Sequence, residues 1–285
     1  MFWHLLSTEN TKIFRRRLLW VVLALIAILV LVIEIVLHAA IENGLSGTAM
    51  PAEDRLNALQ MITWPGALVN VLTLIGGNAL GGLFFVILVS AVTSQEYNWR
   101  TLHLWLSRGV PRPMLRFAKF AALITPALLI VLTALVAGGV ITAFFSFNIN
   151  NSLYLDQVNF SQLVFSVLRT AYTLLPYGAV TYFLAVISRS TVVAISGGLA
   201  YVLLLEDILI QVLGLLGEPL QRMIQYMPST LANSLLALNQ AAIGAGDSST
   251  AGFGIPLIAT LGIAAWILLF LGLSLWIFQR QNLSE

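Results

Sequence analysis

The chain has 285 residues, of which 59% are hydrophobic and only 9% are charged. Soluble domains carry about 25% charged residues, so this composition excludes a soluble globule and indicates an all-α polytopic membrane protein. The absence of cysteine excludes disulfides and thiolate metal sites, and a net charge of +2 is too small to indicate nucleic-acid binding.

The N-terminal stretch, 1–17, is predicted to form an interfacial helix that leads into the membrane. Its aromatic and leucine side chains precede polar residues, and the basic cluster Arg15–Arg17 follows. An ordered tail with basic anchors is the alternative. The next apolar run is about 20 residues long, which is too long for the core of a signal peptide.

We predict one transmembrane domain that covers 1–285 and contains six membrane-spanning helices. The spans are expected at about 18–40, 66–93, 114–145, 162–187, 191–216 and 255–278. Between the last two spans, 219–240 holds two short, half-hydrophobic segments separated by Pro228, and each is too short to cross. A re-entrant pair of helices, which enters and leaves the membrane on one side, fits this pattern.

The centre of the second span is rich in glycine. Gly77 and Gly81 have a GxxxG spacing, which allows another helix backbone to come close. Close helix packing is one interpretation of this segment. A gating hinge is the alternative, because the glycines make the span easy to bend. In the third span, Pro126 is expected to kink the helix.

Lysine and arginine residues gather on one side of the predicted spans, which sets the orientation by the positive-inside rule. They lie in the N-terminal stretch, in the loop after the second span, at Arg189 and at Arg280. The opposite segments contain only Arg55 and Arg222. We therefore expect a multi-pass protein of the cell inner (cytoplasmic) membrane with both termini in the cytoplasm.

The loop after the second span, 95–119, is the only long, polar, basic segment between hydrophobic spans. Its first part, 95–110, is predicted to form an amphipathic helix on the membrane surface that binds another protein. Glu96 and Arg100 have the i,i+4 spacing of a helical ion pair. An ordinary basic loop anchored at the interface is the alternative. The apolar stripe of the predicted helix consists of Trp99, Leu102 and Leu106, with Trp105 at its edge.

The order of residue types in this loop resembles the loop after the second span in permeases of type-2 ABC transporters, where it forms a coupling helix. The matching positions are Glu96, Thr101, Leu102, Leu106, Ser107, Gly109, Val110, Arg112 and Lys119. Arg100 departs from the family pattern, which usually has glycine before the threonine. The interfacial helix, equivalent to the family's elbow helix, the six spans and the re-entrant pair extend the resemblance over nearly the whole chain.

The resemblance implies a permease subunit of the exporter type that moves substrate while a separate ABC ATP-binding subunit hydrolyses ATP. Two copies of that subunit and a second membrane subunit, identical or related, complete such an assembly in the lipid bilayer. ATP and Mg bind to the partner, because this chain has no G-x-x-x-x-G-K-[ST] phosphate loop. The docking residues implied are Glu96, Trp99, Arg100, Thr101, Leu102, Trp105, Leu106, Arg108, Gly109 and Arg112.

Few ionisable residues lie within the predicted spans, and such residues are candidate functional sites. At about 1.5 Å per residue along each helix, we expect them to share one layer in the outer half of the membrane. One interpretation is a network in which Arg169 neutralises the acids and ties helices together. The alternative is a polar patch that lines a translocation route or its outer gate. The charge layer consists of Glu34, His38, Arg169, Glu206 and Asp207.

We expect no catalytic site, metal site or bound cofactor in this chain. Glu34-x-x-x-His38 is not an HExxH motif, and the other histidines, His4 and His103, lie on the predicted cytoplasmic side, so three metal ligands do not converge. Two alternatives to an ATP-driven permease stay open. They are a membrane scaffold or sensor subunit that uses the same docking loop, and a secondary transporter.

Overall fold

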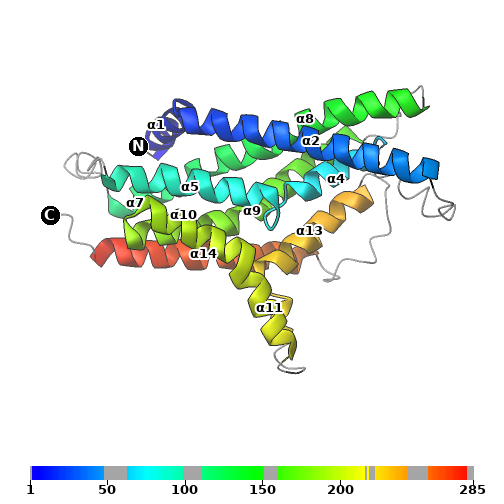
Figure 1. The fold of residues 1–285 in the computed structure, drawn as a ribbon. Coiled ribbons are helices and arrows are strands. Elements are labelled where there is room, and N and C mark those ends of the chain that lie inside the picture. Colours follow the sequence, from blue (N-terminus) through cyan, green and yellow to red (C-terminus); the bar gives the residue numbers. More distant parts are fainter. Residues whose placement is uncertain are drawn as a thin grey trace.

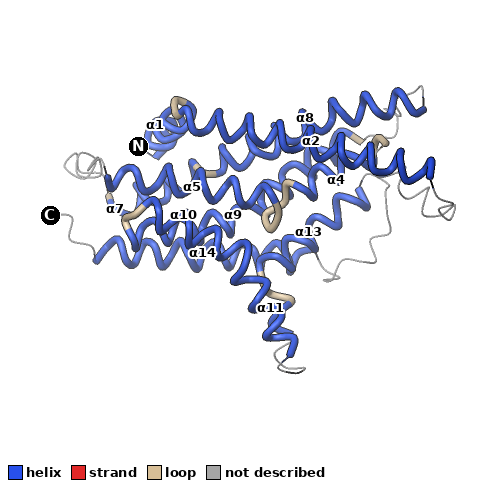
Figure 2. Tube along the Cα trace, viewed as in Figure 1, coloured by secondary structure: helices blue, strands red, loops and turns tan. Residues whose placement is uncertain are grey.

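The computed structural model describes 2–47, 63–98, 111–150, 159–215, 217, 222–242 and 256–280, and the regular elements in these ranges are all helical (Figure 1, Figure 2). The prediction of an all-α protein is therefore confirmed. The elements in chain order are α1 (Phe2–Phe14), α2 (Arg17–Gly47), α4 (Gly66–Leu74), α5 (Leu80–Asn98), α7 (Arg112–Ala122), α8 (Ile124–Asn150), α9 (Phe160–Ser188), α10 (Thr191–Ala200), the π-helix η2 (Tyr201–Leu205), α11 (Glu206–Leu215), α13 (Pro228–Ala242) and α14 (Pro256–Arg280).

Five helical segments in the described part of the chain are long and apolar enough to cross a membrane, judged by length and composition. They are Arg17–Ile41, Pro113–Asn148, Phe160–Ser188, Thr191–Leu215 and Pro256–Arg280. A shorter apolar stretch, Leu80–Gln95, lies within α5. These segments support a multi-pass membrane protein. The layout with six spans stays a prediction, because the second predicted span is divided between α4 and α5.

The helix α9 lies at the centre of the bundle, and α5, α8, α10, α13 and α14 all pack against it. It is more buried than the four other candidate spans. The helices α1 and α7 lie at one end of the bundle, here called the α1 end, whereas α4 and the start of α9 lie toward the opposite, far end (Figure 1). Many apolar side chains of the outer helices are exposed, such as Val192 and Leu268, as expected for a surface that faces lipid.

The second predicted span breaks at its glycines. The backbone N–H of Gly77 donates to the Thr173 hydroxyl of α9, with 3.1 Å between the nitrogen and the oxygen. A Cβ atom on Gly77 would lie 2.0 Å from the Thr173 carbonyl oxygen, so only glycine permits this approach. Backbone that leaves the helix inside a membrane needs such protein partners. The structure therefore supports close packing, and it places a bend at the same glycines.

The third and fifth predicted spans are also irregular. The break between α7 and α8 falls at Leu123, because Pro126 has no N–H to donate to the carbonyl group of Ala122. In the fifth span, the π-helical turn η2 separates α10 from α11. Such turns bend a helix, and α11 projects away from the bundle beyond this point (Figure 1).

The predicted re-entrant pair is described in part. A short helical turn at 222–224 leads through 225–227 to α13, which begins at Pro228. Proline is favoured at the first position of a helix, because its missing N–H has no partner there in any case. The helix α13 packs against α9 and α14, with a smaller contact to α4. Its 15 residues are too few to cross a bilayer, which needs about 20.

The contact at Gly77 yields a test of the fold. Gly77→Ala should destabilise the protein by about 1–3 kcal/mol, because the new methyl group collides with the backbone of α9. Gly272→Ala is the matched control, since a Cβ atom there meets nothing within 4 Å and alanine favours the helix. Thermal unfolding in detergent measures both variants. Equal melting temperatures for Gly77→Ala and the wild type would contradict the close approach.

Candidate functional site

The predicted docking loop lies mostly outside the described residues. Trp99, Arg100, Thr101, Leu102, Trp105, Leu106, Arg108 and Gly109 all fall in the undescribed stretch 99–110. Glu96 belongs to the last turn of α5 and Arg112 begins α7, and the structure describes only the backbone of these two residues. The docking role of all ten residues stays a prediction. What the structure adds is the base from which the loop extends.

The base of the loop is packed against α1. Leu5, Glu9 and Ile13 are the buried residues of α1, and their i,i+4,i+8 spacing places them on one face. Leu5 packs against Leu115 and Ala118 of α7. The helix α1 therefore packs on α7, and α7 is the helix that directly follows the predicted docking loop in sequence.

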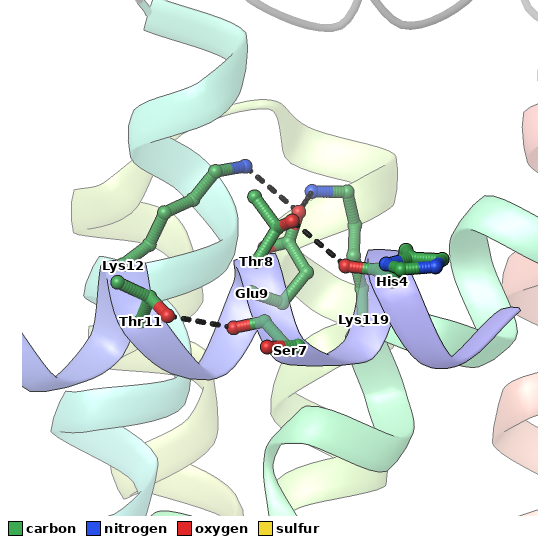
Figure 3. Close-up of polar contacts among 7 residues, drawn as sticks. All are labelled: His4, Ser7, Thr8, Glu9, Thr11, Lys12 and Lys119. Carbon is green, nitrogen blue, oxygen red and sulfur yellow. Dashed lines mark hydrogen bonds and ion pairs between the residues drawn. The ribbon is translucent and has the colours of Figure 1, made fainter. Parts of the chain in front are cut away.

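A buried ion pair fastens this contact. The Lys119 Nζ atom lies 3.0 Å from Glu9 Oε1, and the two side chains are only 6% and 4% exposed. Lys12 Nζ approaches the same oxygen at 2.8 Å from the outer side. Figure 3 shows the Glu9 carboxylate between the ends of the two lysines. At the next residue of α1, Asn10 Oδ1 accepts a hydrogen bond from the Thr125 hydroxyl at 3.1 Å, which joins α1 to the start of α8.

A second contact joins the start of α2 to α5, the helix that precedes the docking loop. The Arg16 guanidinium donates to the Ala91 carbonyl oxygen at 3.0 Å and to Gln95 Oε1 at 2.6 Å. Together with the ion pair, this contact forms a clamp, defined here by Glu9, Arg16, Gln95 and Lys119. The clamp ties both helices that flank 99–110 to the N-terminal segment.

Arg116 also has a different environment from the one expected for a basic loop residue. Its side chain is buried, and its guanidinium carbon lies 3.7 Å from the centre of the Phe278 ring in α14. It donates to the Tyr182 hydroxyl of α9 at 3.3 Å. Arg116 and Lys119 belong to the basic segment 95–119, and in the structure both side chains are buried. Lys119 shares a helix face with the buried Leu115 at i,i+4 spacing, which would have indicated its burial but not its partner.

The acid Glu206 of the predicted charge layer holds the N-terminus of α13. Its side chain is 2% exposed, and its carboxylate accepts a hydrogen bond from the backbone N–H of Ser229. The first N–H groups of a helix have no partner within the helix, and the helix dipole favours a negative charge there. Glu206 therefore caps α13 from the neighbouring span.

Arg169 binds the opposite part of α13. Its guanidinium donates to Asn239 Oδ1 at 3.0 Å, and the Asn239 amide in turn donates to the Thr170 hydroxyl at 3.2 Å. Asn239 lies ten residues beyond Ser229 (239 − 229), or about 15 Å along the helix. Among the described residues Arg169 forms no ion pair with Glu34, Glu206 or Asp207, and its guanidinium is bound to the Asn239 amide instead.

The remaining members of the predicted layer have separate environments. Glu34 is buried on α2, whereas Asp207 is exposed on α11. His38 stacks on the Phe145 ring of α8, with 3.8 Å between ring centres. Within the described ranges, no group of three or more His, Asp or Glu side chains could hold a metal ion. The sequence did not indicate the polar contacts made by three asparagines, because an uncharged amide does not stand out within an apolar span as a charged residue does. These residues are Asn78, Asn233 and Asn239.

Comparisons with known proteins add no identification. No protein-family model matches the chain, and no curated protein matches it.

Substitution of two adjacent acids, Glu206 and Asp207, tests whether Glu206 caps α13. Glu206→Ala should destabilise the protein by about 0.5–2 kcal/mol, the range typical of a lost helix N-cap. The substitution removes the carboxylate that accepts the hydrogen bond from the Ser229 N–H. Asp207→Ala is the matched control, since this side chain is exposed. Melting temperatures in detergent and protease protection of 222–242 measure both. Equal effects of the two substitutions would show that the cap does not hold α13.

Proposed function

We propose that this chain is the membrane-spanning permease subunit of an ATP-driven exporter of the type-2 ABC kind. The observation that carries the proposal is the clamp at the α1 end. Through these contacts α5 and α7, the helices that flank the predicted docking loop, are both attached to the N-terminal segment at Glu9 and Arg16. A loop that receives force from a motor subunit needs such a base, because a mobile base would absorb the movement.

In this proposal the α1 end faces the cytoplasm, and the docking loop binds an ABC ATP-binding subunit. Two such subunits and a second membrane subunit, a copy of this chain or a related one, complete the assembly. ATP and Mg bind to the partner subunits, and their closure biases the membrane helices between two arrangements. The clamp passes the movement of the loop to α5, α7 and α1 together.

The far end of the bundle supplies a candidate gate for the translocation route. Three polar contacts attach α13 to other elements: Glu206 to Ser229, Arg169 to Asn239, and Asn78 at the break in the second span to Asn233 at 3.0 Å. The Asn78–Asn233 contact is exposed. Polar groups and broken helices at membrane depth commonly mark the path of a substrate. We therefore place the route beside the break between α4 and α5.

The docking loop provides the test of this function. The full-length chain, affinity-tagged and isolated from its native membrane, should carry with it a subunit that hydrolyses ATP. A buried aromatic or aliphatic anchor contributes about 2 kcal/mol or more to an interface, roughly thirtyfold in affinity. Leu102→Asp and Trp99→Asp, tested singly, should therefore reduce the recovered ATPase activity about thirtyfold or uncouple it from transport.

The control Leu102→Met keeps an apolar side chain and should preserve the assembly. Thermal unfolding of the isolated membrane subunit should be unchanged by all three substitutions, because the predicted loop lies outside the hydrocarbon core. Full recovery of coupled ATPase activity with both Asp variants would contradict the docking role. Recovery of an ATPase without substrate-stimulated turnover would instead favour a scaffold or sensor subunit, and recovery of no ATPase from the wild type would favour a secondary transporter.

A further inference from the structure

A crevice of about 340 Å³ opens at the far end of the bundle, between α8, the start of α9 and the segment that leads into α4. Its lining is almost entirely carbon. Trp64 contributes the one indole N–H, which is already donated to the Thr142 hydroxyl at 2.9 Å. The lining residues are Trp64, Leu68, Leu135, Val136, Gly139, Val140, Ala143, Phe160 and Leu163.

The crevice opens beside apolar side chains that are exposed on the surface of the bundle. Val136, Val140 and Phe160 at the mouth are 64%, 67% and 69% exposed. Along α8 the lining extends from Leu135 to Ala143, which is about 12 Å at 1.5 Å per residue. One leaflet of the hydrocarbon core is about 15 Å thick, so the crevice has the depth of a single leaflet.

The chemistry of the crevice selects an apolar occupant with a polar end. A polar group placed inside would lose its hydrogen bonds to water without replacement, which costs about 2 kcal/mol or more. Asn159 and Ser161, the sequence neighbours of the lining residue Phe160, are however exposed, and Asn159 Oδ1 accepts from the Ser161 N–H at 3.1 Å. Apolar side chains therefore line the interior of the crevice, and the amide of Asn159 and the hydroxyl of Ser161 lie at the start of α9.

We propose that this crevice binds one acyl chain of a membrane phospholipid, with the headgroup at the Asn159–Ser161 rim. The crevice extends about 12 Å along α8 and its lining is apolar, which matches a length of hydrocarbon chain. A flexible hydrocarbon chain fills such a narrow space from the surrounding leaflet. The site is separate from the predicted docking loop, and its occupation does not depend on the proposed transport function.

Gly139 offers a way to fill the crevice. A Cβ atom there would meet only Leu68 Cδ2 at 3.6 Å and Trp64 Cζ2 at 3.9 Å, which are ordinary contacts. Gly139→Leu should therefore fold and occupy the space of the acyl chain, whereas Gly139→Ala should leave most of it open. Native mass spectrometry of the full chain should show a tightly retained phospholipid in the wild type and in Gly139→Ala, and loss of it in Gly139→Leu.

A second measurement locates the lipid. Each protein is reconstituted into phosphatidylcholine vesicles whose acyl chains are brominated. The fluorescence of Trp64 is obtained by subtracting the emission of the same protein that also carries Trp64→Phe. Bromine should quench this component strongly in the wild type and in Gly139→Ala, and much less in Gly139→Leu. Equal retention and equal quenching in all three proteins would overturn the proposal, as would a wild type that retains no phospholipid.

A third variant tests for a different occupant. The natural sequence has no cysteine, so Val140→Cys places a single thiol at the mouth of the crevice. With an acyl chain in the crevice, oxidation in membranes should leave this variant monomeric. Efficient disulfide formation between two copies would overturn the proposal and assign the crevice to contact with a second copy of this chain.

Discussion

The ion pair between Glu9 and Lys119 constrains the whole α1 end of the molecule. Removing two charges from water costs several kcal/mol per ion, and close pairing offsets this cost only when the geometry is good. Glu9 has two ammonium groups within 3.0 Å, so its charge is well matched. The helix α1 cannot slide along α7 without separating these buried charges. Arg16 holds α5 through hydrogen bonds to the Ala91 carbonyl oxygen and to Gln95 Oε1, so the two helices that flank the predicted docking loop share one base.

At the far end, none of the three contacts that attach α13 is an ion pair. There α13 is attached through a carboxylate on a helix terminus, an arginine on an amide, and a pair of asparagines. The Asn78–Asn233 contact joins two neutral amides, which contributes about 1 kcal/mol net, whereas hydrogen bonds to charged groups such as Glu206 and Arg169 contribute about 1.5–3 kcal/mol. A buried ion pair therefore ties the α1 end, and the weakest of these contacts at α13 is the exposed pair of asparagines. This contrast is what the proposed exporter requires of its docking end and its gate.

Local sequence patterns predicted the local features of the fold. The amphipathic pattern of 1–17 gives α1, the missing N–H of Pro126 accounts for the break at Leu123, and the Gly77–Gly81 spacing marks close packing against α9. The partners of the charged residues could not be predicted in the same way. Arg169 binds an amide 70 positions away, and helical spacing gives the face of a residue without naming what lies opposite.

The most direct measurement of the clamp is the distance between α1 and α7 in a lipid bilayer. His4 and Phe117 are exposed, and the natural chain has no cysteine, so spin labels can be attached to a His4→Cys/Phe117→Cys protein without other changes. Electron–electron double resonance should give one narrow distance distribution, and Glu9→Gln should broaden it, because the buried ammonium of Lys119 loses its carboxylate partner. A distribution that is already broad with Glu9 in place, or one that Glu9→Gln leaves unchanged, would contradict the central role of this ion pair.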